Sequence, residues 1–167
     1  MNSKLKMLII LFPFLYLLHD LEEIMTIESF IEAKSTIIPF RVTTGEFALA
    51  FTLLWIIASI GCIKAFAGKP FLKMKPATYL SFLVPGILLA NGIGHLVQLI
   101  VFKGYVPGII TTLMIIFPYA LFTLKFLFSE RLLTLKRFLR YFSLGFVLQA
   151  PFALIAHIVS YFILTFF

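Results

Sequence analysis

The chain has 167 residues, of which 62% are hydrophobic and 13% are charged, and 21 of them are phenylalanine. This composition, with a mean hydropathy of +1.09, excludes a soluble globular protein and predicts an integral membrane protein. The net charge of +7 does not indicate nucleic-acid binding, because the basic residues stand between apolar segments and not on one soluble face.

Five apolar segments predict an all-α fold, a single transmembrane domain over residues 1–167 with about five spanning helices. The segments run over residues 6–27, 45–67, 77–102, 107–128 and 141–167, each near the ~20 residues that a spanning helix needs. Assigning the basic residues to alternate sides leaves only Lys34, Arg41 and Lys103 on one side. By the positive-inside rule we expect a cytoplasmic N-terminus and an outer C-terminus.

The first segment begins like a signal peptide, but no small-residue cleavage site follows, so we expect an uncleaved helix. Its apolar run, residues 7–18, is too short to cross a bilayer unless the helix continues through His19-Asp20-Leu21-Glu22-Glu23. On a helix, Glu22 and Glu23 lie three and four residues from His19, on the face of the imidazole. Asp20 points about 100° away from His19, and we leave it outside the site.

These ionisable side chains are costly at membrane depth. One such group costs at least ~2.5 kcal/mol on insertion scales, so several together indicate mutual partners or a function. The alternative is that the span ends at Leu18 and the motif is a set of solvated charges in a loop.

Residues 28–44 mix apolar and charged side chains. This pattern predicts a short amphipathic piece that lies along the membrane interface and is ended by Pro39. Glu46 then opens the second helix, where the helix N-terminus favours a carboxylate.

The third segment carries Pro85 in its middle, which removes a backbone donor and predicts a kink. Gly86, Ala90 and Gly94 repeat every four residues on the same helix. Small residues at this spacing predict a groove that lets another helix approach closely.

The three histidines are expected at a similar depth. At ~1.5 Å per residue, His19, His95 and His157 lie roughly 22, 27 and 24 Å from the cytoplasmic ends of their segments. His95 also shares a helix face with Asn91, four residues earlier. The common depth favours one site in the outer third of the membrane, although a single membrane histidine can equally be a hydrogen-bonded packing residue.

A short outer turn, residues 103–108, joins the third and fourth helices. Gly104 and the Pro107-Gly108 pair have the chemistry of a turn, and Tyr105 is either an interfacial aromatic residue or part of the site. The fourth helix has no ionisable residue in its middle, and we interpret it as scaffold.

Three short motifs follow one another along the chain: His19-x-x-Glu22-Glu23, Asn91-x-x-x-His95 and Tyr105-x-Pro107-Gly108. With them the chain resembles the HXXEE family of small bacterial integral membrane proteins, which is identified by an H-x-x-E-E motif, a further histidine and a Y-x-P-G motif. The resemblance implies a multi-pass protein of the bacterial plasma membrane and moves Tyr105 toward a site role. It implies no reaction, because the family has no established activity, and His157 lies outside its pattern.

The site residues favour a metal-dependent or acid–base membrane enzyme with hydrolase-like chemistry. Two imidazoles and one carboxylate can hold a divalent metal, with zinc favoured, and leave a fourth position open for water. We expect His19, His95 and one of Glu22 and Glu23 as ligands, and the other glutamate as general base.

Two further residues are expected to support this chemistry. Asn91 would orient a ligand, and Tyr105 would donate a proton or stabilise an oxyanion. Because lipid surrounds the helices, we expect a lipidic or amphiphilic substrate and a site that opens to the outer leaflet.

Two other classes of function stay open. A transporter or ion-translocating protein would use ionisable residues along a path, but the inner halves of the helices offer hydroxyl side chains and no acid or histidine relay. A non-catalytic membrane protein would use the polar cluster to fix helix packing. The sequence does not indicate an oligomeric state.

Overall fold

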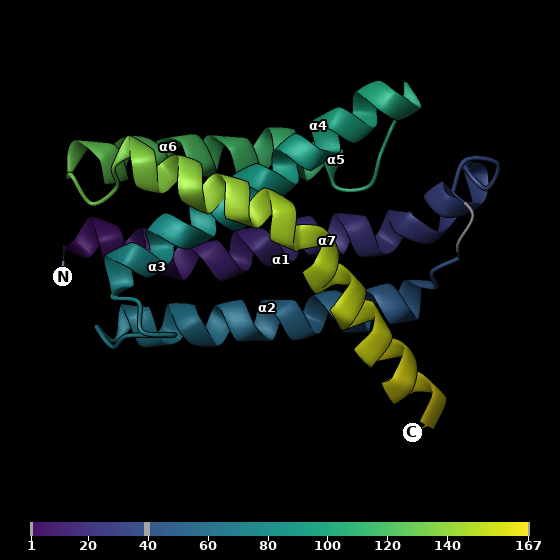
Figure 1. Ribbon diagram of the computed structural model, residues 1–167, viewed down its shortest axis with the longest axis horizontal. Helices are drawn as coiled ribbons and strands as arrows, with labels where there is room; N and C mark the ends of the chain where they lie inside the picture. The colour runs from purple at the N-terminus through teal and green to yellow at the C-terminus, as the bar shows by residue number, and fades with distance from the viewer. Residues whose placement is uncertain (1, 39–40, 167) are drawn as a thin grey trace.

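The computed structural model describes residues 2–38 and 41–166, which form five long helical rods (Figure 1). The all-α prediction is confirmed, and the described ranges contain no strand. Two of the rods are interrupted by π-helical turns, η1 and η2. The rods are α1 (Ser3–Ala33), α2 (Thr44–Phe66), α3–η1–α4 (Pro76–Leu83, Val84–Leu89, Ala90–Phe102), α5–η2–α6 (Ile109–Thr111, Thr112–Ile116, Phe117–Ser129) and α7 (Leu135–Phe166).

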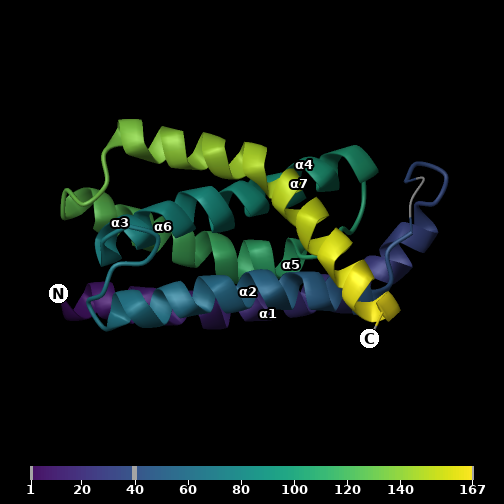
Figure 2. The same ribbon diagram turned by 60° about the horizontal axis from the view of Figure 1, so that its bottom comes forward.

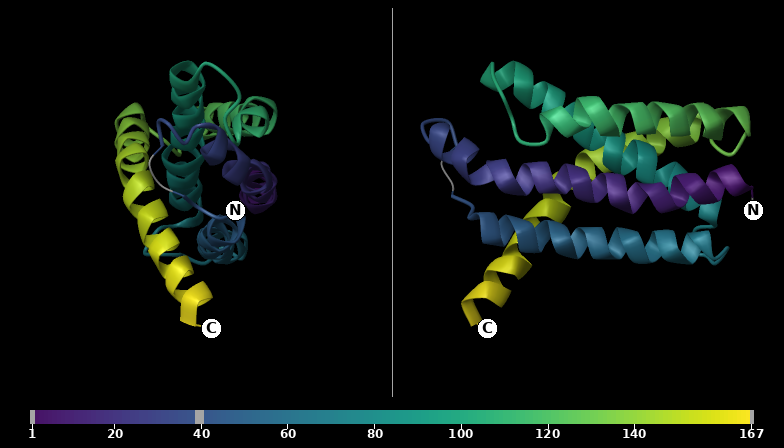
Figure 3. Two further views of the ribbon diagram at one scale, coloured as in Figure 1. Left: turned by 90° about the vertical axis from the view of Figure 1, so that its right-hand side faces the viewer. Right: turned by 180° about the vertical axis from the view of Figure 1, so that it is seen from behind.

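Successive rods run in opposite directions, so the two ends of the chain lie at opposite ends of the bundle (Figure 1). α1 and α2 lie side by side as an antiparallel pair, with α3 and α4 above them (Figure 2). The first half of α7 packs on η1, and its second half crosses α2 and leans away from the other rods (Figure 3).

Four rods are long and apolar enough to cross a membrane: Thr44–Phe66, Pro76–Phe102, Ile109–Ser129 and Leu135–Phe166. They coincide with four of the five predicted spans and are candidate spans by length and composition. α1 is not among them, because the acidic motif interrupts its apolar surface. Its 31 residues correspond to ~46 Å, more than the ~30 Å of a hydrocarbon core. That α1 spans, and which end of the bundle is cytoplasmic, stay predictions.

Two predicted helix ends were wrong. α1 continues to Ala33 and not only to residue 27, because no glycine or proline stands between residue 27 and Pro39. Residues 28–33 are therefore helix and not a separate interfacial piece, and the expected stop at Pro39 lies outside the described residues. α7 begins at Leu135 and not at residue 141, because leucine, lysine and arginine, which have good helix propensity, make up most of residues 135–140.

The start of α2 is fixed by two carboxylates. Glu46 and Thr43 form a capping box, in which Glu46 Oε2 accepts from the Thr43 N–H at 2.9 Å and Thr43 Oγ1 accepts from the Glu46 N–H at 3.2 Å. Glu28, near the end of α1, accepts from the Thr44 N–H at 2.9 Å. Glu28 thus ties α1 to the start of α2.

The apolar core lies between the first half of α1 and the rods that pack on it. Its most buried side chains are Leu8, Ile9, Phe12, Leu80, Leu83 and Leu127, all under 2% exposed. The third rod is the central one, since 56% of its most apolar stretch is buried, against 11% for α7. The core therefore supports α1 and the central rod, the two elements that carry His19 and His95.

The irregularity predicted at Pro85 is the π-helical turn η1, in which Gln149 of α7 donates to the Ile87 carbonyl at 3.2 Å. The predicted small-residue groove exists in part. Gly86 lies so close to Gly145 of α7 that a Cβ added to Gly145 would overlap the Gly86 backbone, whereas Gly94 faces open space. Only one end of the groove is occupied by another helix.

Candidate His–Glu site

α1 turns one broad stripe of side chains toward the interior. The stripe is apolar from Leu5 to Phe12 and polar beyond, and its members recur every three or four positions, as on one face of a helix: Leu5, Leu8, Ile9, Phe12, Tyr16, His19, Asp20 and Glu23. His19 is 1% and Glu23 is 4% exposed. The acidic motif thus continues the buried face of α1, contrary to the alternative of solvated loop charges.

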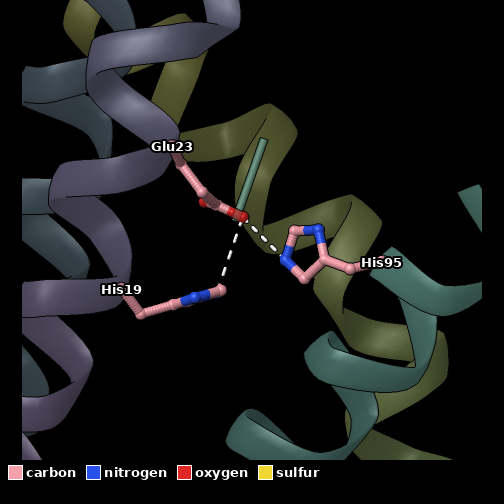
Figure 4. Close-up of side chains that lie close together, drawn as sticks. All are labelled: His19, Glu23 and His95. Carbon is pink, nitrogen blue, oxygen red and sulfur yellow. Dashed lines mark ion pairs between the residues drawn. The ribbon is translucent and has the colours of Figure 1, made fainter. Parts of the chain in front are cut away.

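α4 places His95 opposite this stripe. His95 Nε2 lies 2.8 Å from Glu23 Oε1, and His19 Nε2 lies 3.6 Å from the same oxygen (Figure 4). The ligand atoms of the three side chains lie within 4.8 Å of one another. We call these three residues the His–Glu cluster.

The contact between His95 and Glu23 is close but is not a hydrogen bond. A distance of 2.8 Å is short enough for one, yet the ring is turned so that the angles are wrong. Neither ring nitrogen of His95 has a hydrogen-bond partner among the described residues, although the side chain is 4% exposed. Since buried polar atoms are normally paired, His95 keeps the capacity to bind a further group.

Gly108, which precedes α5, stands directly over the cluster. A Cβ built on it would lie 2.8 Å from His19 Cε1 and 2.9 Å from both Glu23 Oε1 and His95 Cε1, closer than real side chains approach. Its φ of 79° also favours glycine. The absence of a side chain at this position leaves the space between the three residues free.

The cluster is closed in this structure. All three side chains are at most 4% exposed, and the main chain at Gly108 lies over them. The expectation that the site opens directly to a membrane leaflet is therefore not met. Any ligand larger than an ion or a water molecule requires the turn before α5 to move.

The second nitrogen of His19 is held by Thr111. His19 Nδ1 lies 2.8 Å from Thr111 Oγ1, and the same hydroxyl donates to Glu22 Oε2 at 2.5 Å. Because the hydroxyl proton goes to the carboxylate, Oγ1 accepts from Nδ1–H, and Nε2 carries the lone pair beside Glu23. Asn91 Nδ2 lies 2.8 Å from that Nε2. We call this arrangement the Glu22–Thr111–His19 chain.

Glu22 binds partners different from those of Glu23, although the two are adjacent. Its carboxylate accepts from the N–H groups of Ile110 at 3.1 Å and Thr111 at 2.7 Å, and from the Tyr105 hydroxyl at 2.9 Å. Partial burial raises the pKa of Tyr105, and the negative charge of Glu22 adds to the rise, so the phenol remains a donor at neutral pH. Glu22 thus ties α1 to the start of α5 and is not one of the three converging ligands.

Asp20, which the sequence reasoning left out, is also buried. It is 1% exposed, and neither carboxylate oxygen has a hydrogen-bond partner in the part of the chain that the structure describes. On a helical wheel Glu23 lies between His19 and Asp20, about 40° from the first and 60° from the second. The buried stripe is therefore wide enough to include both His19 and Asp20, although their side chains point about 100° apart.

His157 is not brought to the cluster. Its ring lies against Phe47 and Phe51 of α2, with centroids 5.5 and 6.4 Å away. Conversely, Thr111 was missed because a threonine in an apolar segment gives no signal of a polar partner. The fourth rod, interpreted as scaffold, supplies at its start the hydroxyl that contacts His19.

The profile of a family described as protein of unknown function with HXXEE motif matches residues 10–123. The chain belongs to this family. Comparisons with curated proteins and with solved structures gave no match. In this HXXEE protein the matched region contains the whole His–Glu cluster and the Glu22–Thr111–His19 chain, and it ends before α7 and His157.

The three motifs found in the sequence converge in space. The H-x-x-E-E motif supplies His19 and Glu23 of the cluster, and His95 completes it. The same motif supplies Glu22, which accepts a hydrogen bond from Tyr105 of the Y-x-P-G motif. Gly108 of that motif lies over the cluster.

Proposed function

We propose that this chain is a divalent-metal-dependent enzyme of the bacterial plasma membrane. One observation carries the proposal: His19, Glu23 and His95 converge in a buried space without pairing with one another by hydrogen bonds. A cluster that only fixed helix packing would be expected to satisfy its own donors and acceptors. This one leaves His95 Nδ1 without a hydrogen-bond partner among the described residues, and His95 Nε2 meets Glu23 Oε1 only in a contact without hydrogen-bond geometry.

The donor set supports a small, open metal site. Two imidazoles and one carboxylate are a ligand set of catalytic zinc, which keeps a fourth position for water or substrate. The space left by Gly108 would accommodate that fourth position. Iron(II) or manganese are the main competitors for such nitrogen and oxygen ligands, so zinc is the first metal to test and not the only one.

The surrounding residues would orient the ligands. Through its hydroxyl, Thr111 would hold His19 so that Nε2 faces the cluster, and Glu22 would hold Thr111. Asn91 Nδ2, which lies 2.8 Å from that Nε2, would have to turn away for Nε2 to bind the metal. Glu22 has four donors on its carboxylate, so we assign it a positioning role and no longer that of general base. A bound metal would supply Lewis-acid chemistry or an activated water.

The place of the cluster suggests the substrate class. The cluster lies toward the end of the bundle where α1 ends, and the distribution of basic residues favours the outer face for this end. A substrate that reaches a site between spanning helices would be lipidic or amphiphilic. Tyr105, 43% exposed and bonded to Glu22, would couple arrival of a substrate at the turn to the cluster.

The test is the metal content of detergent-purified protein by elemental mass spectrometry. We expect about one divalent ion per chain in the wild type, and loss of that ion in Glu23→Gln and in His95→Ala. His157→Ala and Glu32→Gln are matched controls, a histidine and an α1 carboxylate outside the cluster, and should keep the metal. Metal-free, folded wild type that takes up no zinc, iron or manganese on dialysis would overturn the proposal.

A further inference from the structure

A second polar site lies away from the cluster, between the first turn of α2 and the last turns of α7. It is a cavity of about 320 Å³, with polar and apolar walls. The lining side chains that matter for its chemistry are Arg41, Glu46, His157, Tyr161, Ile158 and Phe162. None of them belongs to the His–Glu cluster or to the family-matched region's motifs, so the cavity is independent of the proposed function.

One wall of the cavity is built rigidly. Phe47 and Phe51 stack on each other with centroids 4.2 Å apart, and the His157 ring packs against both. This packing holds α7 against α2 at the cavity. His157, which lies outside the His–Glu cluster, therefore lines this cavity instead.

Two opposite charges face the cavity. Within the described residues no ion pair joins Arg41 to a carboxylate, so its guanidinium is available to an anion. Glu46 uses Oε2 for its capping bonds, and Oε1 accepts no hydrogen bond from the described part of the chain. The cavity thus offers one binding point for an anion and one for a cationic donor.

The occupant must be both zwitterionic and apolar. α2 and α7 are membrane-span candidates, and the cavity lies where one begins and the other ends. In a membrane, this position would lie at the level of the lipid headgroups. Ile158 and Phe162 extend the polar end with apolar surface. At about 320 Å³, the cavity is near the lower limit of ~300–1,000 Å³ for ligand pockets, which fits a headgroup better than a whole lipid.

We propose that this cavity binds the headgroup of a zwitterionic phospholipid with a primary amine, such as phosphatidylethanolamine. Arg41 contacts the phosphate, where a planar guanidinium can bind two oxygens. Glu46 Oε1 accepts from the ammonium group. The acyl chains lie along Ile158 and Phe162 toward the bilayer.

The experiment is native mass spectrometry of the detergent-purified full chain titrated with phosphatidylethanolamine, phosphatidylcholine or phosphatidylglycerol of the same acyl chains. The wild type should retain phosphatidylethanolamine best. Phosphatidylcholine lacks ammonium N–H donors, and phosphatidylglycerol lacks the cation. Arg41→Gln should weaken binding of phosphatidylethanolamine by at least about fivefold, the value for one basic residue at a membrane surface.

Glu46→Gln separates headgroup recognition from helix capping. Glutamine can replace glutamate in a capping box, so α2 should keep its start while the negative charge is lost. The preference for phosphatidylethanolamine over phosphatidylglycerol should then disappear. Lys34→Gln, a basic residue of the same loop that does not line the cavity, should change nothing.

Equal retention of the three lipids by the wild type, or unchanged binding in Arg41→Gln, would overturn the inference. A preference for phosphatidylglycerol over phosphatidylethanolamine in both the wild type and Glu46→Gln would also overturn it. Metal content measured on the same samples keeps the two proposals apart, because Arg41→Gln should retain the metal of the cluster.

Discussion

His95 Nε2 and Glu23 Oε1 lie 2.8 Å apart in the interior and yet do not share a hydrogen bond. This imidazole nitrogen and carboxylate oxygen, brought close without a hydrogen bond, face a common space with His19. A cation stabilises such an arrangement, whereas removal of one partner leaves the other buried and unpaired. The relationship therefore makes substitutions around the cluster informative.

Gly108→Ala should remove bound metal. The added methyl group would enter the space between His19, Glu23 and His95. We expect at least a tenfold loss of metal content at limiting metal, measured by elemental mass spectrometry, with helical content unchanged by circular dichroism.

Two glycine substitutions control for the other effects of Gly108→Ala. Gly68→Ala also places alanine at positive φ, at a cost of about 1–2 kcal/mol, but faces open space. Gly104→Ala lies in the same turn and meets no atom closer than 3.9 Å. Both should keep the metal. If Gly68→Ala lost it equally, backbone strain and not crowding would explain the result.

Thr111→Val should weaken metal binding about 10- to 100-fold, the range for loss of an outer-shell partner. Valine keeps the branched shape of threonine but cannot accept from His19 Nδ1 or donate to Glu22. Competition with a chelator of known affinity measures the change. Thr111→Ser restores the hydroxyl and should recover most of the affinity, and failure of serine to do so would assign the effect to packing.

Gly145→Ala should destabilise the bundle by about 1–3 kcal/mol, as expected for overpacking. Its Cβ would overlap the backbone of Gly86 at the crossing of α7 and the central rod. Gly94→Ala, on that rod but facing open space, should be neutral or stabilising by up to about 1 kcal/mol, since alanine favours helix. Unfolding in a denaturing detergent gradient compares the two, and equal effects would contradict the close contact.

Asp20→Leu should stabilise the protein by about 1–3 kcal/mol, because it removes a buried carboxylate without a hydrogen-bond partner among the described residues. The same unfolding assay measures this change. Metal content should stay at the wild-type value. Loss of metal in Asp20→Leu would instead place Asp20 in the site.

Much of the fold follows from hydropathy. The second and third segments were predicted over residues 45–67 and 77–102 and are observed as Thr44–Phe66 and Pro76–Phe102, because sharp changes in apolarity coincide with their ends. The ends of α1 and α7 were misjudged, because charged residues such as Glu32 and Lys136 continue a helix without continuing an apolar run.

The site was predictable only as far as helical spacing reaches. Helical spacing places Glu22 and Glu23 equally well beside His19, so it does not indicate which of the two joins the cluster. The choice depends on the N–H groups of Ile110 and Thr111, which belong to another rod. Depth placed His157 level with His95, but depth does not say on which side of the bundle a residue lies. Packing between distant segments decided each of these points.

The polar stripe of α1 also bears on how the protein is made. The hydrogen-bond partners of His19 are distant in sequence: Thr111 is 92 residues away and Asn91 is 72 residues away. During synthesis α1 therefore leaves the ribosome long before these two hydrogen-bond partners of its polar face. With α2 tied to it through Glu28 and Thr44, the first two helices form a hairpin that would enter the bilayer shallowly. Insertion of α1 to full depth would then wait for the third and fourth rods, which makes it a late step of biogenesis.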